Sequence, residues 1–238
     1  MCCGEGEYSM LKLLVSGSYP LMEYIKREIQ KRRDSIQNLT VQEMDSKHLL
    51  SQPNYIHNED ILICGVVLAE RLKELNVRGH LVPLRVQSQD FIKALVKASE
   101  YSGEICIVNY YKEFIAEDTY FNEEGLKGKL GLNIKQYVYT STEHAEEVVK
   151  MLSQDNQRVI IGSGLIVNLA EKYGLNGVLW YGQETIQLSV DIAFDILKAK
   201  VQERGNQKRQ SIIMENFHEG VISLNRMNRI IHINQAAI

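Results

Sequence analysis

Small hydroxyl side chains beside glycines are the residues of this sequence with the clearest potential for chemistry. They occur in turns at Ser16-Gly17-Ser18 and Gly162-Ser163-Gly164, and a third glycine turn without a hydroxyl lies at Gly65. Each turn comes after an apolar run typical of a buried strand and before an apolar-periodic helix. Such turns expose backbone N–H groups at a helix start, and these groups bind carboxylates or phosphates. Short strand-to-helix turns also need glycine for geometry alone, so one turn is weak support. Three together favour a site for a small anion.

Further side chains that follow predicted strands are expected at the same site. Arg85 would offer a bidentate partner for a carboxylate, and tyrosine rings would line a pocket while offering a hydroxyl. The alternatives are a surface or interlobe salt bridge for Arg85 and partial packing between lobes for the tyrosines. If Arg85 binds a carboxylate, replacing it by alanine should abolish stabilisation by carboxylates. The residues predicted to face a ligand are Ser18, Tyr19, Cys64, Gly65, Arg85, Ser88, Asn109, Tyr110, Ser163, Gly164 and Tyr181.

Sequence motifs for common catalytic chemistry are absent. There is no GxGxxG after a first strand and no GxxxxGK[ST], and the six histidines are scattered without metal-ligand spacing. A nucleophile elbow around Ser163 would need glycine at the positions of Ile161 and Leu165. We therefore expect no catalytic residue, no metal and no cofactor.

Composition indicates a cytoplasmic globular protein. The 238 residues are 45% hydrophobic with a net charge of −3, which allows one large domain or two small ones and gives no basic surplus for nucleic acid. No apolar run approaches the ~20 residues of a membrane span, and no secretory segment is evident. Of the four cysteines, Cys64 and Cys106 lie in apolar strands and are predicted to be reduced core residues.

Strands and helices alternate through residues 11–200, which predicts a parallel α/β architecture. The strands would form one sheet or two smaller sheets with a cleft, and the chain would cross between lobes near 83–88 and 181–183. Gln89 or Asp90 is expected to cap one helix, and Ser141 or Thr142 another. An irregular helical stretch is expected after Tyr111, whereas the polar segment 45–58, with Pro53 inside it, has a poorly defined pattern.

The sequence changes character after Glu184. A long helix is expected, interrupted at Gly205 and resumed to Phe217, with Leu197, Val201, Lys208 and Ile212 roughly on a heptad line. That line gives weak support for pairing with another copy. Residues 220–233 then have the pattern of a β-hairpin. A hairpin with nothing after it predicts that the chain is a fragment of a longer protein.

A family resemblance rests on five segments. LLVSGSYPLMEYI (13–25), EDILICGVVLAERLKE (59–74), VPLRVQSQDFIKALVKASEYSGEICIVNY (82–110) and VIIGSGLIVNLAEKYGLNGVLWYGQETI (159–186) resemble the amino-terminal sensor domain of the propionate catabolism activator PrpR. IIMENFHEGVISLNRMNRIIHINQAA (212–237) resembles the opening of a PAS domain. Sensor, connector and PAS domain follow in this order in sigma-54-dependent regulators.

The resemblance implies two α/β lobes with an interlobe cleft, similar in layout to periplasmic binding proteins, and no catalysis. It also implies missing AAA+ and helix-turn-helix domains, which would engage sigma-54 RNA polymerase and DNA. The resemblance also suggests the kind of ligand, since the ligand sensed by the propionate regulator is similar to the tricarboxylate 2-methylcitrate. One turn departs from the family, which usually has Arg-Gly-Gly where this chain has Cys64-Gly65-Val66. A neutral cysteine cannot clamp a carboxylate as arginine does.

The sequence therefore predicts a metabolite-sensing region with four parts. These are a disordered lead-in (1–9), a sensor domain (10–200, lobe one about 10–84 plus 182–200 and lobe two about 85–181), a helical connector (201–217) and the start of a PAS domain (218–238). The expected partners are a small-molecule effector and a second copy of the chain, with no membrane. An α/β enzyme, which turnover of a metabolite would reveal, and a dimerisation scaffold, which would bind no metabolite, are the alternatives.

Overall fold

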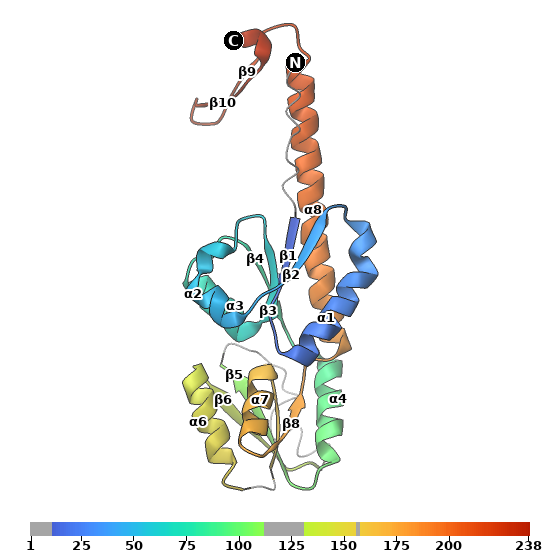
Figure 1. Cartoon of the computed structure of the whole chain (residues 1–238), viewed down its shortest axis with the longest axis vertical. Helices are drawn as coiled ribbons and strands as arrows, with labels where there is room; N and C mark the ends of the chain where they lie inside the picture. The colour runs from blue at the N-terminus through green and yellow to red at the C-terminus, as the bar shows by residue number, and fades with distance from the viewer. Residues whose placement is uncertain (1–10, 112–130, 156–157) are drawn as a thin grey trace. The chain divides into compact units, whose positions relative to one another are not determined.

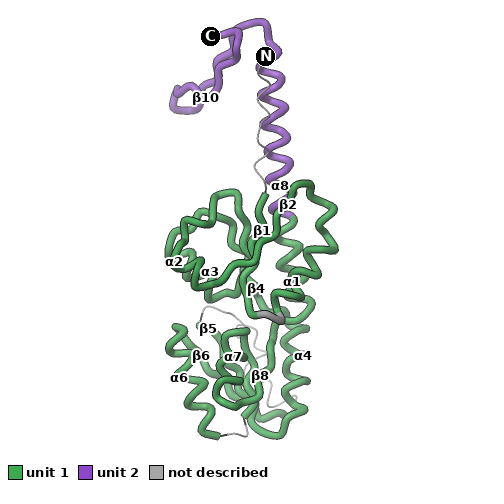
Figure 2. Tube along the Cα trace, viewed as in Figure 1, with its two compact units in different colours: residues 1–194 green, residues 195–238 purple. Residues whose placement is uncertain are grey.

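The computed structural model describes residues 11–111, 131–155 and 158–238 (Figure 1). The predicted lead-in and the irregular stretch expected after Tyr111 fall on 1–10 and 112–130, outside the described residues. The chain divides into two compact units, residues 1–194 and 195–238 (Figure 2). None of the described helices is long and apolar enough to span a membrane.

The first lobe is a four-stranded parallel sheet with helices on both faces. In spatial order its strands are β2 (Leu39–Glu43), β1 (Leu11–Val15), β3 (Ile61–Gly65) and β4 (His80–Leu84). Its helices are α1 (Tyr19–Arg32), α2 (Ser46–Ser51) and α3 (Val66–Glu74), with short 3-10 turns at Arg33–Ser35 and Pro53–Tyr55. The two central strands are almost wholly apolar and buried, which is typical of a sheet covered on both sides.

The second lobe repeats this arrangement. Its strands lie in the order β6 (Ile134–Tyr139), β5 (Glu104–Tyr110), β7 (Arg158–Gly162) and β8 (Asn176–Leu179), all parallel. Its helices are α4 (Ser88–Ser99), α6 (Thr142–Leu152) and α7 (Gly164–Lys172). The Ser141 hydroxyl accepts a hydrogen bond from His144 N at 3.1 Å, as expected for a helix cap. The prediction of two parallel α/β lobes is confirmed.

Two hydrophobic clusters each contain one cysteine, one inside the first lobe and one in the second lobe that also takes in Val66 of α3 from the first lobe. Cys64 packs with Leu14, Leu62 and Leu72, while Cys106 packs with Val108 and Ile160 among other buried residues. Burial raises the pKa of each thiol to about 12, since the apolar surroundings disfavour the thiolate. Both cysteines are free, as predicted.

Helix α8 (Gln183–Glu215) is continuous, so the predicted break at Gly205 is wrong. A glycine inside a helix costs only about 1 kcal/mol relative to alanine, which weakens a helix without ending it. The predicted hairpin is present as β9 (Ile222–Leu224) and β10 (Ile230–Ile233), followed by a 3-10 turn at Gln235–Ala237. The buried Asn234 joins the hairpin to the helix end, because its amide accepts from Val221 N and donates to Met214 O at 2.7 and 3.1 Å.

The two crossings between the lobes are joined by reciprocal hydrogen bonds between the first turns of α4 and α8. The buried Asp90 carboxylate on α4 accepts from Thr185 N on α8 at 2.7 Å. In return, the buried Thr185 hydroxyl accepts from Gln87 N, at the start of α4, at 3.1 Å. The expectation that Asp90 caps its own helix is therefore corrected, because the carboxylate turns toward the neighbouring helix. We call these two bonds the crossed caps.

Native-state labelling tests the burial of the cysteines. At mildly alkaline pH, iodoacetamide should modify neither Cys64 nor Cys106 in the folded chain, because the thiolate is the nucleophile and both pKa values are raised. Both should react in denaturant, and peptide mass mapping separates them from the other cysteines. Rapid labelling of Cys64 in the folded chain would mean that its side chain faces solvent.

Substitutions in the crossed caps test their contribution to stability. Thr185→Val should lower the free energy of unfolding by about 1–3 kcal/mol, because it leaves the N–H of Gln87 without its acceptor. Asp195→Asn is the control, since this carboxylate is 78% exposed and its loss should change stability by less than about 0.5 kcal/mol. Equal effects of the two substitutions in a urea titration would contradict the account.

Candidate ligand-binding site

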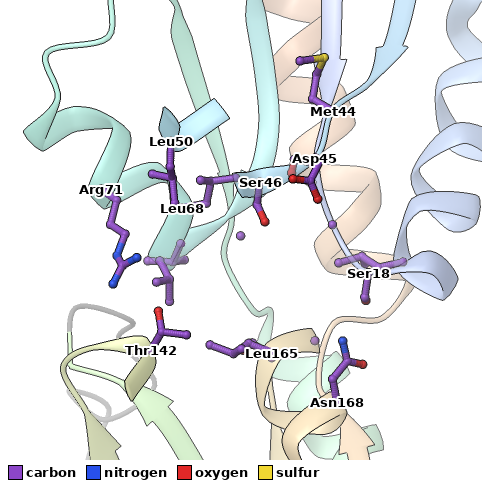
Figure 3. A pocket seen from close by; sticks show the side chains of 18 of the residues that line it. Ser18, Met44, Asp45, Ser46, Leu50, Leu68, Arg71, Thr142, Leu165 and Asn168 are labelled. Carbon is purple, nitrogen blue, oxygen red and sulfur yellow. The ribbon is translucent and has the colours of Figure 1, made fainter. Parts of the chain in front are cut away.

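A cavity of about 340 Å³ lies at the carboxyl ends of the strands, lined by residues of both lobes (Figure 3). Its lining includes the turns after β1 and β3 in one lobe and after β7 in the other. In each sheet these strands lie where the strand order reverses, with β1 beside β3 and β5 beside β7. Ligands of open α/β sheets bind at such switch points.

The first lobe contributes the N-termini of two helices. Ser18 is the N-cap of α1, and its hydroxyl makes no capping hydrogen bond. Gly65 is the N-cap of α3, and a Cβ built on it would meet nothing within 4 Å, so the backbone there faces open space. Both helix starts can therefore present N–H groups and a positive dipole end to the cavity.

The second lobe contributes the N-terminus of α7. Its N-cap, Ser163, is buried at 8% exposure, and the hydroxyl has no hydrogen-bond partner among the described residues. Gly162 is required just before it, because a Cβ would approach Val108 O to 2.9 Å and the side chain of Ile166 more closely still. A Cβ on Gly164 would stand 2.8 Å from Ser18 Oγ, so the two lobes come close together at this point.

Among the described residues, two charged side chains line the cavity, Arg71 and Asp45, both from the first lobe. Figure 3 shows Arg71 extending from α3 toward Thr142 of the second lobe. Arg71 also adds a little to the lowered pKa of Glu143, which results chiefly from hydrogen bonds donated by its own backbone N–H and by Ser141. Asp45 is the N-cap of α2, where Oδ1 accepts from Lys47 N and His48 N at 2.9 and 3.0 Å.

The structure brings together five of the residues predicted to face a ligand. Ser18, Gly65, Ser163, Gly164 and Tyr181 all line the cavity. Tyr181 also lines a second cavity, beside α1 and the start of α8. It therefore connects the central cavity to the first residues of α8.

The other predicted residues lie elsewhere. Cys64 is fully buried in the core. Tyr110 is also buried and packs on Tyr139, with 5.5 Å between the centroids of the two rings. Asn109 is buried in β5 and accepts from Gln136 Nε2 at 2.9 Å. Arg85 is exposed in the crossing and Ser88 is exposed at the start of α4, and neither lines the cavity. The side chain of Tyr19 is outside the described residues.

Sequence reasoning missed the polar residues that α2, α3 and the second lobe add to the site. These are Asp45, Ser46, Arg71, Thr142 and Asn168. Arg71 was detectable, because it lies one helical turn after Val67, which also lines the cavity, on the same face of α3. Asp45 was detectable as a helix cap before Ser46. Among the described residues, no group of three or more histidine, cysteine, aspartate or glutamate side chains is arranged to hold a metal.

Comparisons with solved structures find an NtrC family transcriptional regulator from Clostridium acetobutylicum, with a TM-score of 0.61 and 16% identity over 81% of this chain and 99% of that chain. Looser similarity is found to an ABC domain from Streptococcus pneumonia in complex with L-Trp (TM-score 0.46, 10% identity, 80% of this chain and 85% of that chain). A conserved domain protein from Vibrio cholerae is similarly distant (TM-score 0.45, 10% identity, 79% and 85%).

A family model for the PrpR_N domain, described as propionate catabolism activator, matches residues 39–203, which is more than half of the chain. The match includes α2, α3, the whole second lobe and the first part of α8. The chain therefore belongs to the propionate catabolism activator family and carries its PrpR_N domain, the sensor domain of a transcriptional regulator.

Proposed function

We propose that this chain senses a small metabolite with at least one carboxylate or phosphate group, bound in the cavity between the lobes. The observation that carries the proposal is the convergence of three helix N-termini, those of α1, α3 and α7, on one cavity. Each helix N-terminus stabilises a nearby negative charge by about 0.3–1 kcal/mol. The positive dipole ends of three helices that face one cavity repel each other, and a bound anion relieves this repulsion.

The buried hydroxyl of Ser163 supports the same proposal. A buried polar group without a partner is destabilising, and such groups are found where a ligand supplies the missing hydrogen bond. Arg71 supports it too, since its guanidinium makes no hydrogen bond or ion pair with the side chains that the structure describes. A carboxylate in the cavity would offer both groups an acceptor.

Ligand binding would then act on helix α8. A ligand that contacts both lobes stabilises their closed arrangement in proportion to its differential affinity for that arrangement. Tyr181 lines the cavity two residues before α8 begins, and the crossed caps fix the first turn of α8 to α4. Closure would therefore change the position of the first turn of α8 relative to the first lobe.

In the full regulator, we propose that α8 relays this change to a PAS domain, of which residues 218–238 are the start, and then to AAA+ and DNA-binding domains. Those domains would engage sigma-54 RNA polymerase and DNA. Exposed apolar residues on α8, such as Val201 and Ile212, support pairing with a second copy. The chain itself would perform no catalysis.

Two arginine substitutions test whether a carboxylate binds in the cavity, beside Arg71, or at the connection between the lobes that contains Arg85. A thermal-shift screen with small mono-, di- and tricarboxylates, phosphates and amino acids should find compounds that raise the melting temperature. Arg71→Ala should weaken binding of carboxylates by at least about tenfold, because a charge-assisted hydrogen bond is lost. Arg85→Ala should leave it unchanged, since Arg85 does not line the cavity. The reverse result would place the site at the crossing.

Ser163→Ala separates stability from binding. Because the Ser163 hydroxyl is buried without a described partner, its removal should leave the free energy of unfolding unchanged or raise it by up to about 1 kcal/mol. Ligand affinity, measured by calorimetry, should fall by about five- to tenfold through the loss of one hydrogen bond. A variant that is less stable but binds normally would show that the hydroxyl has a structural partner instead.

A further inference from the structure

The charged side chains that line the cavity are balanced in sign within the described part of the chain. It contains one positive side chain, Arg71, and one negative side chain, Asp45, among the described residues. A site for a citrate-like polycarboxylate would be expected to carry a surplus of positive side chains, since each carboxylate needs its own partner. A carboxylate beside Asp45 would also be repelled by it. The charge balance therefore indicates that the ligand carries both signs of charge.

Asp45 has an oxygen available for a ligand. Its Oδ1 accepts both capping hydrogen bonds, from Lys47 N and His48 N, which fixes the position of the carboxylate. Its Oδ2 makes no hydrogen bond to any residue in the described part of the chain, and Figure 3 shows the carboxylate beside Ser46 at the edge of the cavity. An ammonium group, which donates three hydrogen bonds, suits such an oxygen.

Apolar side chains form the rest of the wall. They are Leu21, Met44, Leu50, Val67, Leu68 and Leu165. Leu50 and Leu68 lie between Arg71 and Ser46 in Figure 3, so an apolar part of the ligand would have a surface beside both polar groups. The cavity volume, about 340 Å³, is within the range of small-molecule sites.

We propose that the ligand is a zwitterion of the amino-acid class with an apolar side chain. Its carboxylate is held by Arg71 and the helix N-termini, its ammonium by Asp45 Oδ2, and its side chain by Leu50 and Leu68. This inference rests on the proposed function, because it specifies the metabolite class for the same cavity.

Paired compounds test the inference. Each standard L-amino acid and citrate are titrated into the chain by calorimetry. For each apolar amino acid, the analogue without the amino group and the analogue without the carboxylate are titrated too; for leucine these are 4-methylpentanoate and 3-methylbutylamine. We expect at least one apolar amino acid to bind at least about tenfold more tightly than either analogue, since each analogue loses hydrogen bonds to a charged group. If citrate or a des-amino acid binds as tightly as every amino acid, the inference fails and the proposed function stands. If nothing binds, both fail.

Asp45→Asn tests the assigned partner without removing the helix cap. Asparagine keeps the acceptor oxygen and is as good an N-cap as aspartate, so α2 should remain folded. The variant should bind the amino acid at least about tenfold more weakly, yet bind its des-amino analogue as the unmodified chain does. Asp34→Asn, at an exposed carboxylate outside the cavity, is the matched control and should change neither affinity. Equal amino-acid affinity for Asp45→Asn and the unmodified chain would overturn the inference.

Discussion

The crossed caps between α4 and α8 are the interaction on which the two-lobed arrangement depends. Asp90 accepts from Thr185 N, and the Thr185 hydroxyl accepts from Gln87 N, so each helix start satisfies a backbone N–H of the other. Asp90 and Thr185 are nearly fully buried, where an unmet hydrogen bond costs about 1–3 kcal/mol. Gly182 is part of the same contact, because a Cβ there would stand 2.4 Å from Asp90 Oδ1. Both connections between the lobes therefore meet at one contact, and we propose this contact as the pivot of the lobe movement.

The cavity lies beyond this pivot, where the lobes approach each other at Ser18 and Gly164. Its polar groups are of two kinds. Helix N-termini from both lobes favour an anion, while Arg71 and Asp45 from the first lobe supply opposite charges. A ligand that satisfies both kinds would bind the lobes together, and the pivot would limit the response to a rotation that includes the start of α8.

Much of the fold could be predicted from the sequence, because buried parallel strands are continuous apolar runs and the glycine turns mark where helices begin. The site was only partly predictable. The turns at Ser18, Gly65 and Ser163 were found because they directly follow strands. Arg71 was missed because it lies in the second turn of a helix, and Asp45 because its segment lacks apolar periodicity. Residues chosen only for following a strand, such as Cys64 and Tyr110, point into the cores, since side chains alternate between the two faces of a sheet.

Hydrogen–deuterium exchange of the chain, with and without the compound that most raises its melting temperature, tests the central claim most directly. We predict that binding slows exchange together in four segments: 16–22, 65–71, 163–168 and the first turns of α8 at 183–190. Protection of the first three would locate the ligand in the cavity, and protection of the fourth would show that α8 responds through the pivot. Protection confined to one lobe, or to segments that do not line the cavity, would contradict the account.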